Sequence, residues 1–372
     1  MTDMIAQIRG KMQDEKYQSG TRLGWLASVR MLVISIMAFG YASTMPRGMD
    51  KAEYFNMFGY DPSWIAIQVV FMISGFLALR SLQRHGSVWK MFMSRAMRNL
   101  PTLMVFVALV ILVLYPVFGS PIAAGESRFG LHLEYFIKVV SCVDPGTRTP
   151  GLLDNALYMC VIQGGLWTFR WGLVAFMATG LMWVVGALRN RHFLAMMTFA
   201  SVLIYVVIFM YNLNNPNAEF GKYIQAAVTA LRLGWMYMVG MCMYAYRAEL
   251  PRTLAIPAGF LALAGVQFFF LAWTPFIEIC MDLGFGYLAF IAMTSHRKVP
   301  KRIQMLPDLS LGIYIYNWPA AQIALLVMPS ITPYPLFFVS FSVTLLLSYA
   351  TWLLLSRRIN LSISRRMSPQ LA

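Results

Sequence analysis

The chain has 372 residues, of which 59% are hydrophobic and 12% are charged, with a formal net charge of +15. Soluble domains carry about a quarter charged residues, so this composition excludes an ordinary soluble protein and indicates an integral membrane protein. A nucleic-acid binder gathers its basic residues on one accessible face, whereas here they fall between apolar runs, so no nucleic-acid partner is expected. The first 23 residues are polar and mixed in charge, so no cleavable signal peptide is predicted.

Apolar runs of about 20 residues, the length that crosses a bilayer as a helix, recur along the chain. They predict an all-α bundle with about ten transmembrane helices, near 24–44, 62–82, 99–118, 169–188, 193–211, 224–246, 254–273, 276–295, 309–328 and 335–355. The intervening 119–168 is too short or too mixed in its apolar runs to span. It is predicted to be an external loop with interfacial or re-entrant pieces.

The stretch 71–101 fixes the orientation of the predicted bundle. It is interpreted as two apolar spans joined by a short basic turn, with Arg80, Arg84, Lys90, Arg95 and Arg98 and no acid. Basic residues in short loops stay on the cytoplasmic side of a membrane. Residues 1–23 and the basic tail 356–372 are therefore both predicted to be cytoplasmic, on either side of a single membrane domain, 24–355.

Charged residues inside the predicted spans are candidates for function, because charge at the bilayer centre is costly. They are Arg30, Arg232, Glu278 and Asp282, with Arg170 at the outer start of the fourth span. Glu278 and Asp282 lie four residues apart, on one helix face, where two carboxylates repel each other. Two interpretations remain open: a structural ion-pair network, or the favoured one, a polar cavity in which arginines bind an anionic donor.

The predicted spans contain no histidine, and the chain shows no metal-ligand spacing, P-loop or dinucleotide fingerprint. Cys142 and Cys160 both fall in the predicted external segment, where an oxidising compartment could join them. A disulfide between them and a pair of free thiols remain equally open.

Four stretches carry a resemblance to a known family. They are LASVRMLVISIMAFGYAS (26–43), FMISGF (71–76) followed by SRAMRNLP (94–101), GGLWTF (164–169) and SLGIYIYNWP (310–319). In order and spacing they resemble the acyltransferase 3 family of multi-span membrane acyltransferases. The resemblance implies no tightly bound cofactor but a donor such as acetyl-CoA on the cytoplasmic side. The acyl group would pass through the bundle to an acceptor hydroxyl. In FMISGF, Ser74 and Gly75 are interpreted as close helix packing rather than catalysis.

The chain departs from the family pattern at three positions. The family's catalytic histidine in the first span falls on Tyr41, the acidic residue after the LWTL-like element falls on Gly172, and the histidine of the HWP motif is Asn317. A free tyrosine has a pKa of about 10, so Tyr41 would donate a hydrogen bond but would be a poor base. Glu278 or Asp282 is a substitute base by hypothesis.

The favoured function is an O-acyltransferase of a bacterial inner membrane that transfers an acyl group, acetyl above all, from acyl-CoA to a hydroxyl of an exopolysaccharide or cell-envelope glycan. The expected partners are membrane lipid, a glycan or lipid-linked glycan acceptor, and polysaccharide-synthesis machinery. Arg30 would contact the donor, and Tyr41 would point into the reaction cavity. The remaining site residues are Arg84, Lys90, Arg95 and Arg98 for coenzyme A, and Trp167, Arg170, Tyr314, Asn317 and Trp318 for substrate.

The replaced residues at 41, 172 and 317 support an alternative. The fold would persist without acyl transfer and serve as a polysaccharide export or assembly subunit. A small-molecule transporter is disfavoured, because no pair of Gly/Pro-broken helices recurs in the two halves.

Overall fold

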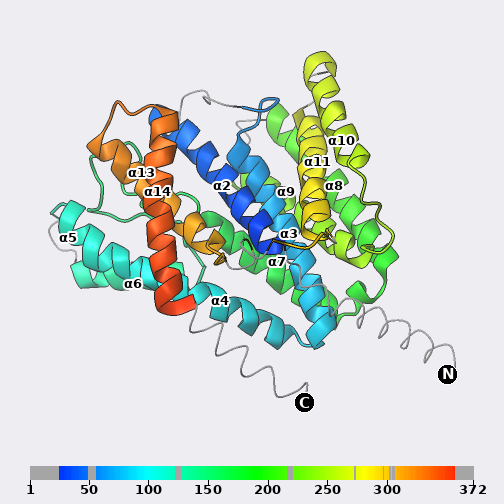
Figure 1. Ribbon diagram of the computed structural model, residues 1–372, viewed down its shortest axis with the longest axis horizontal. Coiled ribbons are helices and arrows are strands. Elements are labelled where there is room, and N and C mark those ends of the chain that lie inside the picture. Colours follow the sequence, from blue (N-terminus) through cyan, green and yellow to red (C-terminus); the bar gives the residue numbers. More distant parts are fainter. Residues whose placement is uncertain are drawn as a thin grey trace.

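A computed structural model of the chain describes residues 25–48, 56–121, 127–215, 221–271, 274–295, 297–300, 303 and 306–356. The regular structure in these ranges is helical throughout, which confirms the all-α prediction (Figure 1). Each predicted span overlaps a helix: α2 (Leu26–Thr44), α3 (Pro62–His85), α4 (Val88–Leu109), α7 (Trp167–Val184), α8 (Arg191–Asn214), α9 (Gly221–Ala245), α10 (Ala255–Val266), α11 (Thr274–Met293), α13 (Ser310–Val327) and α14 (Pro333–Thr351).

Within the described residues, seven helical segments are long and apolar enough to cross a bilayer, and they indicate a multi-pass membrane protein. They are Leu26–Arg47, Pro62–His85, Val88–Phe118, Arg191–Asn214, Tyr223–Ala245, Thr274–Met293 and Pro333–Leu354. Ala255–Leu271 is a shorter apolar helix, and α7 and α13 are not among the seven. A count of ten spans stays a prediction. So does the side on which the termini lie, since 1–24 and 357–372 lie outside the described residues.

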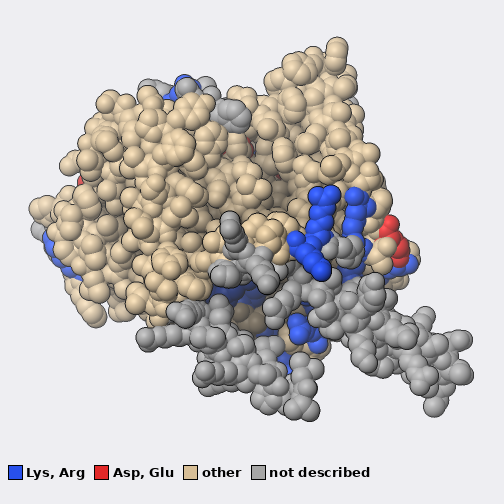
Figure 2. All heavy atoms as spheres, viewed as in Figure 1, with Lys and Arg blue, Asp and Glu red and all other residues tan. Residues whose placement is uncertain are grey.

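Large apolar side chains remain exposed around the bundle, for example Leu346 of α14 at 72% and Phe199 of α8 at 66%. Figure 2 shows a broad uncharged surface, with most of the visible lysine and arginine side chains in the lower right part of the view. This distribution suits a surface that lies against lipid.

The hairpin of α3 and α4 differs from the expected short basic turn, because its basic residues lie on the two helices. Asp61 caps the start of α3 by accepting a hydrogen bond from the Ser63 amide at 2.7 Å, and Gly86, in the left-handed region at φ 62°, ends the helix. Ser87 then caps α4, which begins at Val88 rather than near residue 99. The basic residues Lys90, Arg95 and Arg98 therefore lie on a helix, which Figure 1 shows running obliquely across one end of the bundle.

Helices α3 and α9 make the most extensive interhelical contact in the described part. Two glycines permit it: a Cβ added at Gly75 would lie 1.9 Å from the Tyr237 carbonyl oxygen, and one at Gly240 would lie 1.9 Å from that of Met72. The backbones are in direct contact at both points. The interpretation of Gly75 as a packing residue is confirmed.

The region between α4 and α7 holds one short helix, α6 (Arg128–Val140), with π-helical and α-helical turns η2 (Val110–Leu114) and α5 (Tyr115–Phe118) before it. Exposed Phe129, Leu133 and Ile137 recur every four residues on α6, which gives it an apolar face. Helix α6 is too short to span, in agreement with the interfacial interpretation. Residues 141–166 form no regular element.

Side-chain amides hold this irregular segment against α13. Pro319 has no N–H, so the Ile315 carbonyl one turn earlier lacks its helical partner. The Gln163 amide donates to that carbonyl at 2.6 Å and to the Tyr314 carbonyl at 3.2 Å. Gln322 of α13 donates in return to the Tyr158 carbonyl at 2.7 Å. These hydrogen bonds satisfy backbone carbonyls on both sides of the contact.

Candidate functional site

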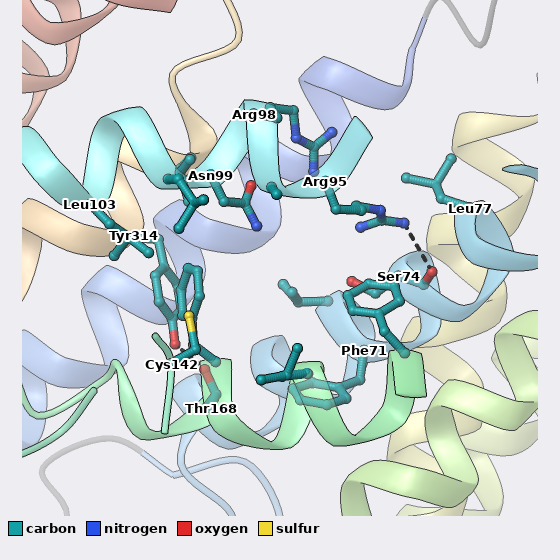
Figure 3. Close-up of a pocket in the computed structure, with 18 of the residues that line it drawn as sticks. Phe71, Ser74, Leu77, Arg95, Arg98, Asn99, Leu103, Cys142, Thr168 and Tyr314 are labelled. Carbon is teal, nitrogen blue, oxygen red and sulfur yellow. Dashed lines mark hydrogen bonds between the residues drawn. The ribbon is translucent and has the colours of Figure 1, made fainter. Parts of the chain in front are cut away.

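A cavity of about 390 Å³ lies between α2, α3, α4, α7 and α13, and Ser141 and Cys142 of the irregular segment belong to its wall. Its wall is mainly apolar, with Phe71, Leu77 and Leu103 among the lining side chains (Figure 3). Polar groups enter at defined points, which is the usual character of a ligand site. The described residues that line it include no histidine, aspartate or glutamate.

Three arginines make one end of this cavity positive. Arg95 and Arg98 lie three residues apart on α4, and Arg30 comes from α2. Arg95 donates to the Ser74 carbonyl at 3.3 Å, and its guanidinium carbon lies 4.6 Å from the centre of the Phe176 ring. Arg30 forms an ion pair with Asp308. The ion pairs among the described residues do not include Arg95 or Arg98, so these two charges are free to meet an anion.

Tyr314 and Thr168 form a polar wall elsewhere in the cavity (Figure 3). The Tyr314 hydroxyl donates to the Gly165 carbonyl at 2.5 Å and is also hydrogen-bonded to the Thr168 hydroxyl. Asn99 lines the cavity one turn beyond Arg95 on the same helix. Asn99 and Phe176 were missed by the sequence analysis, although Asn99 stands inside the SRAMRNLP stretch at a helical spacing from Arg95. Ser74, which was interpreted as a packing residue, also lines the cavity.

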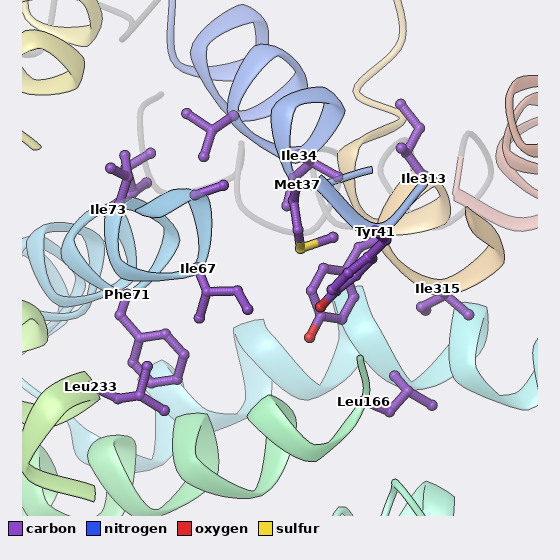
Figure 4. Close-up of a cluster of buried hydrophobic side chains, with 14 of the residues drawn as sticks. Ile34, Met37, Tyr41, Ile67, Phe71, Ile73, Leu166, Leu233, Ile313 and Ile315 are labelled. Atoms are coloured by element: carbon purple, nitrogen blue, oxygen red, sulfur yellow. The ribbon is translucent and has the colours of Figure 1, made fainter. Parts of the chain in front are cut away.

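Tyr41 does not line the cavity, contrary to expectation. Its ring packs in an apolar cluster with side chains from α2, α3 and α13, such as Met37 and Ile313 (Figure 4). It meets the Trp318 ring edge to face at 5.1 Å between centroids. Its hydroxyl is buried and has no hydrogen-bond partner among the described residues. Gly164 makes room here, because a Cβ at that position would lie 2.3 Å from the Trp318 ring.

Glu278 and Asp282 also lie outside the cavity wall. They belong to a closed cluster between α3, α8, α9 and α11, in which Glu278 forms an ion pair with Arg232 and accepts a hydrogen bond from the Tyr205 hydroxyl at 2.8 Å. Arg30 takes no part, since its partner is Asp308. Glu278 and Arg232 therefore form a buried ion pair, in line with the interpretation as a structural network. Arg30, in contrast, lines the cavity.

The other candidate residues are divided between the cavity region and the surface. Arg84, Lys90 and Arg170 are exposed and do not line the cavity. Trp167 is half-buried, 5.8 Å from the Trp64 ring, beside the cavity residue Thr168. Asn317 is fully buried, and both polar atoms of its amide lack partners among the described residues. Trp318 donates to the Gln322 side chain at 3.1 Å.

Cys142 and Cys160 are both free thiols, so the disulfide alternative is not realised. Cys142 lines the cavity, and burial raises the pKa of its thiol. Cys160 donates to the Asp154 carboxylate at 3.1 Å. Among the described residues, no group of three or more histidine, cysteine or acidic side chains is placed to hold a metal ion.

Comparisons with protein-family models, with curated proteins and with solved structures found no match. The likeness to the acyltransferase 3 family therefore rests on the four sequence stretches alone, and the function is argued from the cavity.

Proposed function

We propose that the protein is a membrane-embedded O-acyltransferase that binds acyl-CoA in the arginine-lined cavity. It transfers the acyl group to a hydroxyl of an exopolysaccharide or cell-envelope glycan in a bacterial inner membrane. One observation carries the proposal: Arg95 and Arg98, which have no carboxylate partner in the described part of the chain, stand at one end of a mainly apolar cavity of about 390 Å³.

The cavity has a basic end and an apolar wall, which match the phosphates and the less polar acyl arm of such a donor. Guanidinium groups bind phosphate oxygens through forked, charge-assisted hydrogen bonds, so Arg95 and Arg98 suit the phosphates of coenzyme A. The apolar wall suits the less polar arm and the acyl chain. Arg30 lines the same space but also holds Asp308, which lowers its expected share in anion binding.

In the transfer, the acceptor oxygen forms a bond to the acyl carbon, the carbon–sulfur bond breaks, and the acceptor proton passes to the departing thiolate. Hydrogen-bond donors near the developing oxyanion would stabilise the intermediate. Asn99 and Arg95 are the cavity groups with N–H donors suited to that role. No base is assigned, because the carboxylates considered for it, Glu278 and Asp282, do not line the cavity.

The alternative function, an export or assembly subunit that has lost acyl transfer, is favoured by a different observation. The cavity wall, as far as it is described, lacks histidine and carboxylate, and Tyr41 is packed among apolar side chains. Such a protein would keep an anion-binding cavity without turnover.

One experiment distinguishes these functions. Purified protein in detergent is incubated with radiolabelled acetyl-CoA, with and without membrane glycan. Label that moves to the glycan supports the acyltransferase. Saturable retention of acetyl-CoA without transfer supports the alternative, and absence of any saturable binding rejects a coenzyme A site altogether.

A further inference from the structure

The closed cluster between α3, α8, α9 and α11 contains more negative than positive charge. Glu278 and Asp282 are 2% and 1% exposed, and Arg232 is the basic residue that lines the site with them. The other described residues at the site, Tyr60, Trp64, Ile65, Gln68 and Met281, carry no charge at neutral pH. If both carboxylates were ionised, the site would hold one uncompensated negative charge.

Arg232 forms its ion pair with Glu278. Its Nε pairs with one oxygen of that carboxylate, to which the Gln68 amide also donates at 3.4 Å, and Tyr205 donates to the other oxygen. The guanidinium also lies over the Trp64 ring, 4.3 Å from its centre. Arg232, Gln68 and Tyr205 all donate to this carboxylate, so both of its oxygens have partners within the cluster.

Asp282 is the unsatisfied member of the pair. Its Oδ2 is buried and has no hydrogen-bond partner among the described residues. A buried ionised carboxylate needs a counter-charge and hydrogen bonds, and Arg232 is already engaged one helical turn away. The unpartnered oxygen points to a missing positive ligand.

The size of the site decides which ligand this is. The space between these residues has essentially no volume, about 0 Å³, so neither a water molecule nor a hydrated cation fits. A bare metal cation would also be repelled by Arg232 and would lack the several oxygen ligands that such ions need. A proton requires no space and neutralises the excess charge.

We infer that the cluster is a proton-binding site in which Asp282, the carboxyl group that Arg232 does not pair with, carries one proton at neutral pH. The proton is enclosed by four helices, so it exchanges with solution only when α11 separates locally from its neighbours. Proton release from Asp282 is thereby linked to helix movement inside the bundle.

Infrared spectroscopy of the purified full-length protein tests this inference. A protonated carboxylic acid has a carbonyl stretch that ionised carboxylates lack. Wild-type protein at neutral pH should show this band, shifted by isotopic labelling of aspartate but not of glutamate. Asp282→Asn should remove it, whereas Glu249→Gln, a change in an exposed ion pair with Arg191, should leave it unchanged.

A second variant tests the charge balance. In Glu278→Gln, Arg232 has only Asp282 to neutralise, so Asp282 should ionise and the band should disappear although Asp282 is intact. The inference is overturned if wild-type protein lacks an aspartate-derived band or if the band survives in Asp282→Asn. It is also overturned if Glu278→Gln retains the full band. The isotope result on wild-type protein stands even if a variant fails to fold.

Discussion

Helix α3 lies between two polar sites whose arginines differ in their carboxylate partners and in the space around them. On one side, Arg95 and Arg98 face a cavity of about 390 Å³ and have no carboxylate partner among the described residues. On the other side, Arg232 is locked to Glu278 in a site with no free volume. An arginine inside the bundle can therefore meet a bound anion only where space accompanies it. Four predictions test this contrast.

The largest expected effect is on the closed site. Arg232→Met leaves Glu278 buried without its counter-charge, and breaking a buried pair in this way costs about 3–5 kcal/mol. Thermal unfolding in detergent should show a large loss of stability at neutral pH.

Arg191→Met is the matched control for that change. Its ion pair with Glu249 is exposed, with side-chain accessibilities of 47% and 55%, so its removal should cost less than about 1 kcal/mol. Equal losses for the two variants would contradict the distinction between a closed and an exposed pair.

At the open site, the double change Arg95→Ala and Arg98→Ala should weaken binding of coenzyme A on the order of 100-fold, because each charge-assisted hydrogen bond contributes about 1.5 kcal/mol or more. Stability should change little, since these charges have no carboxylate to leave behind. Isothermal titration calorimetry measures the affinity. Arg84→Ala with Lys90→Ala is the control, as both side chains are exposed away from the cavity. An equal loss in the control would show that general basic charge, rather than the cavity, binds the donor.

Helix α3, which lies between the two sites, is held in place by its close contact with α9. Gly75→Ala should destabilise the protein by about 2 kcal/mol, because the new methyl group meets the Tyr237 carbonyl and forces the helices apart. Gly234→Ala, on α9 with nothing within 4 Å of the added carbon, should be neutral or slightly stabilising. Thermal unfolding compares the two, and equal melting temperatures would refute the close contact.

The smallest expected effect concerns the irregular segment 141–166. Gln163→Leu removes the donor to the Ile315 carbonyl and should cost about 1–2 kcal/mol. Protease sensitivity within 141–166 should rise while the helices remain intact. Gln225→Leu, at an exposed position on α9, is the control and should leave sensitivity unchanged. Unchanged sensitivity in Gln163→Leu would mean that other contacts hold the segment.

Hydropathy alone predicted where the helices lie, because each apolar run must form its hydrogen bonds internally in lipid. It also found Arg30, Arg232, Glu278 and Asp282 as unusual residues. It could not predict their pairing: Arg30 meets Asp308, and Arg232 meets Glu278, across distances in sequence that only helix packing decides. The start of α4 was missed for a local reason, since its basic first half lowers the hydropathy although Ser87 caps a helix there.

Resemblance to family motifs was informative in a different way. It drew attention to Arg95, Arg98 and Tyr314, which line the cavity, and to Gly75, which packs against α9. It also suggested Tyr41, which the structure places in an apolar cluster. A matching motif predicts where a residue lies in the fold, but it does not predict whether a different side chain at that position faces the cavity.

The hydrogen bond from Gln163 to the Ile315 carbonyl has a consequence for folding. The chain reaches α13 about 150 residues after Gln163, and this helix contains a carbonyl that its own backbone cannot satisfy. The Gln163 amide that completes it precedes α13 in the chain. Packing of α13 against 141–166 therefore satisfies this carbonyl and brings Tyr314 to the cavity wall in the same step.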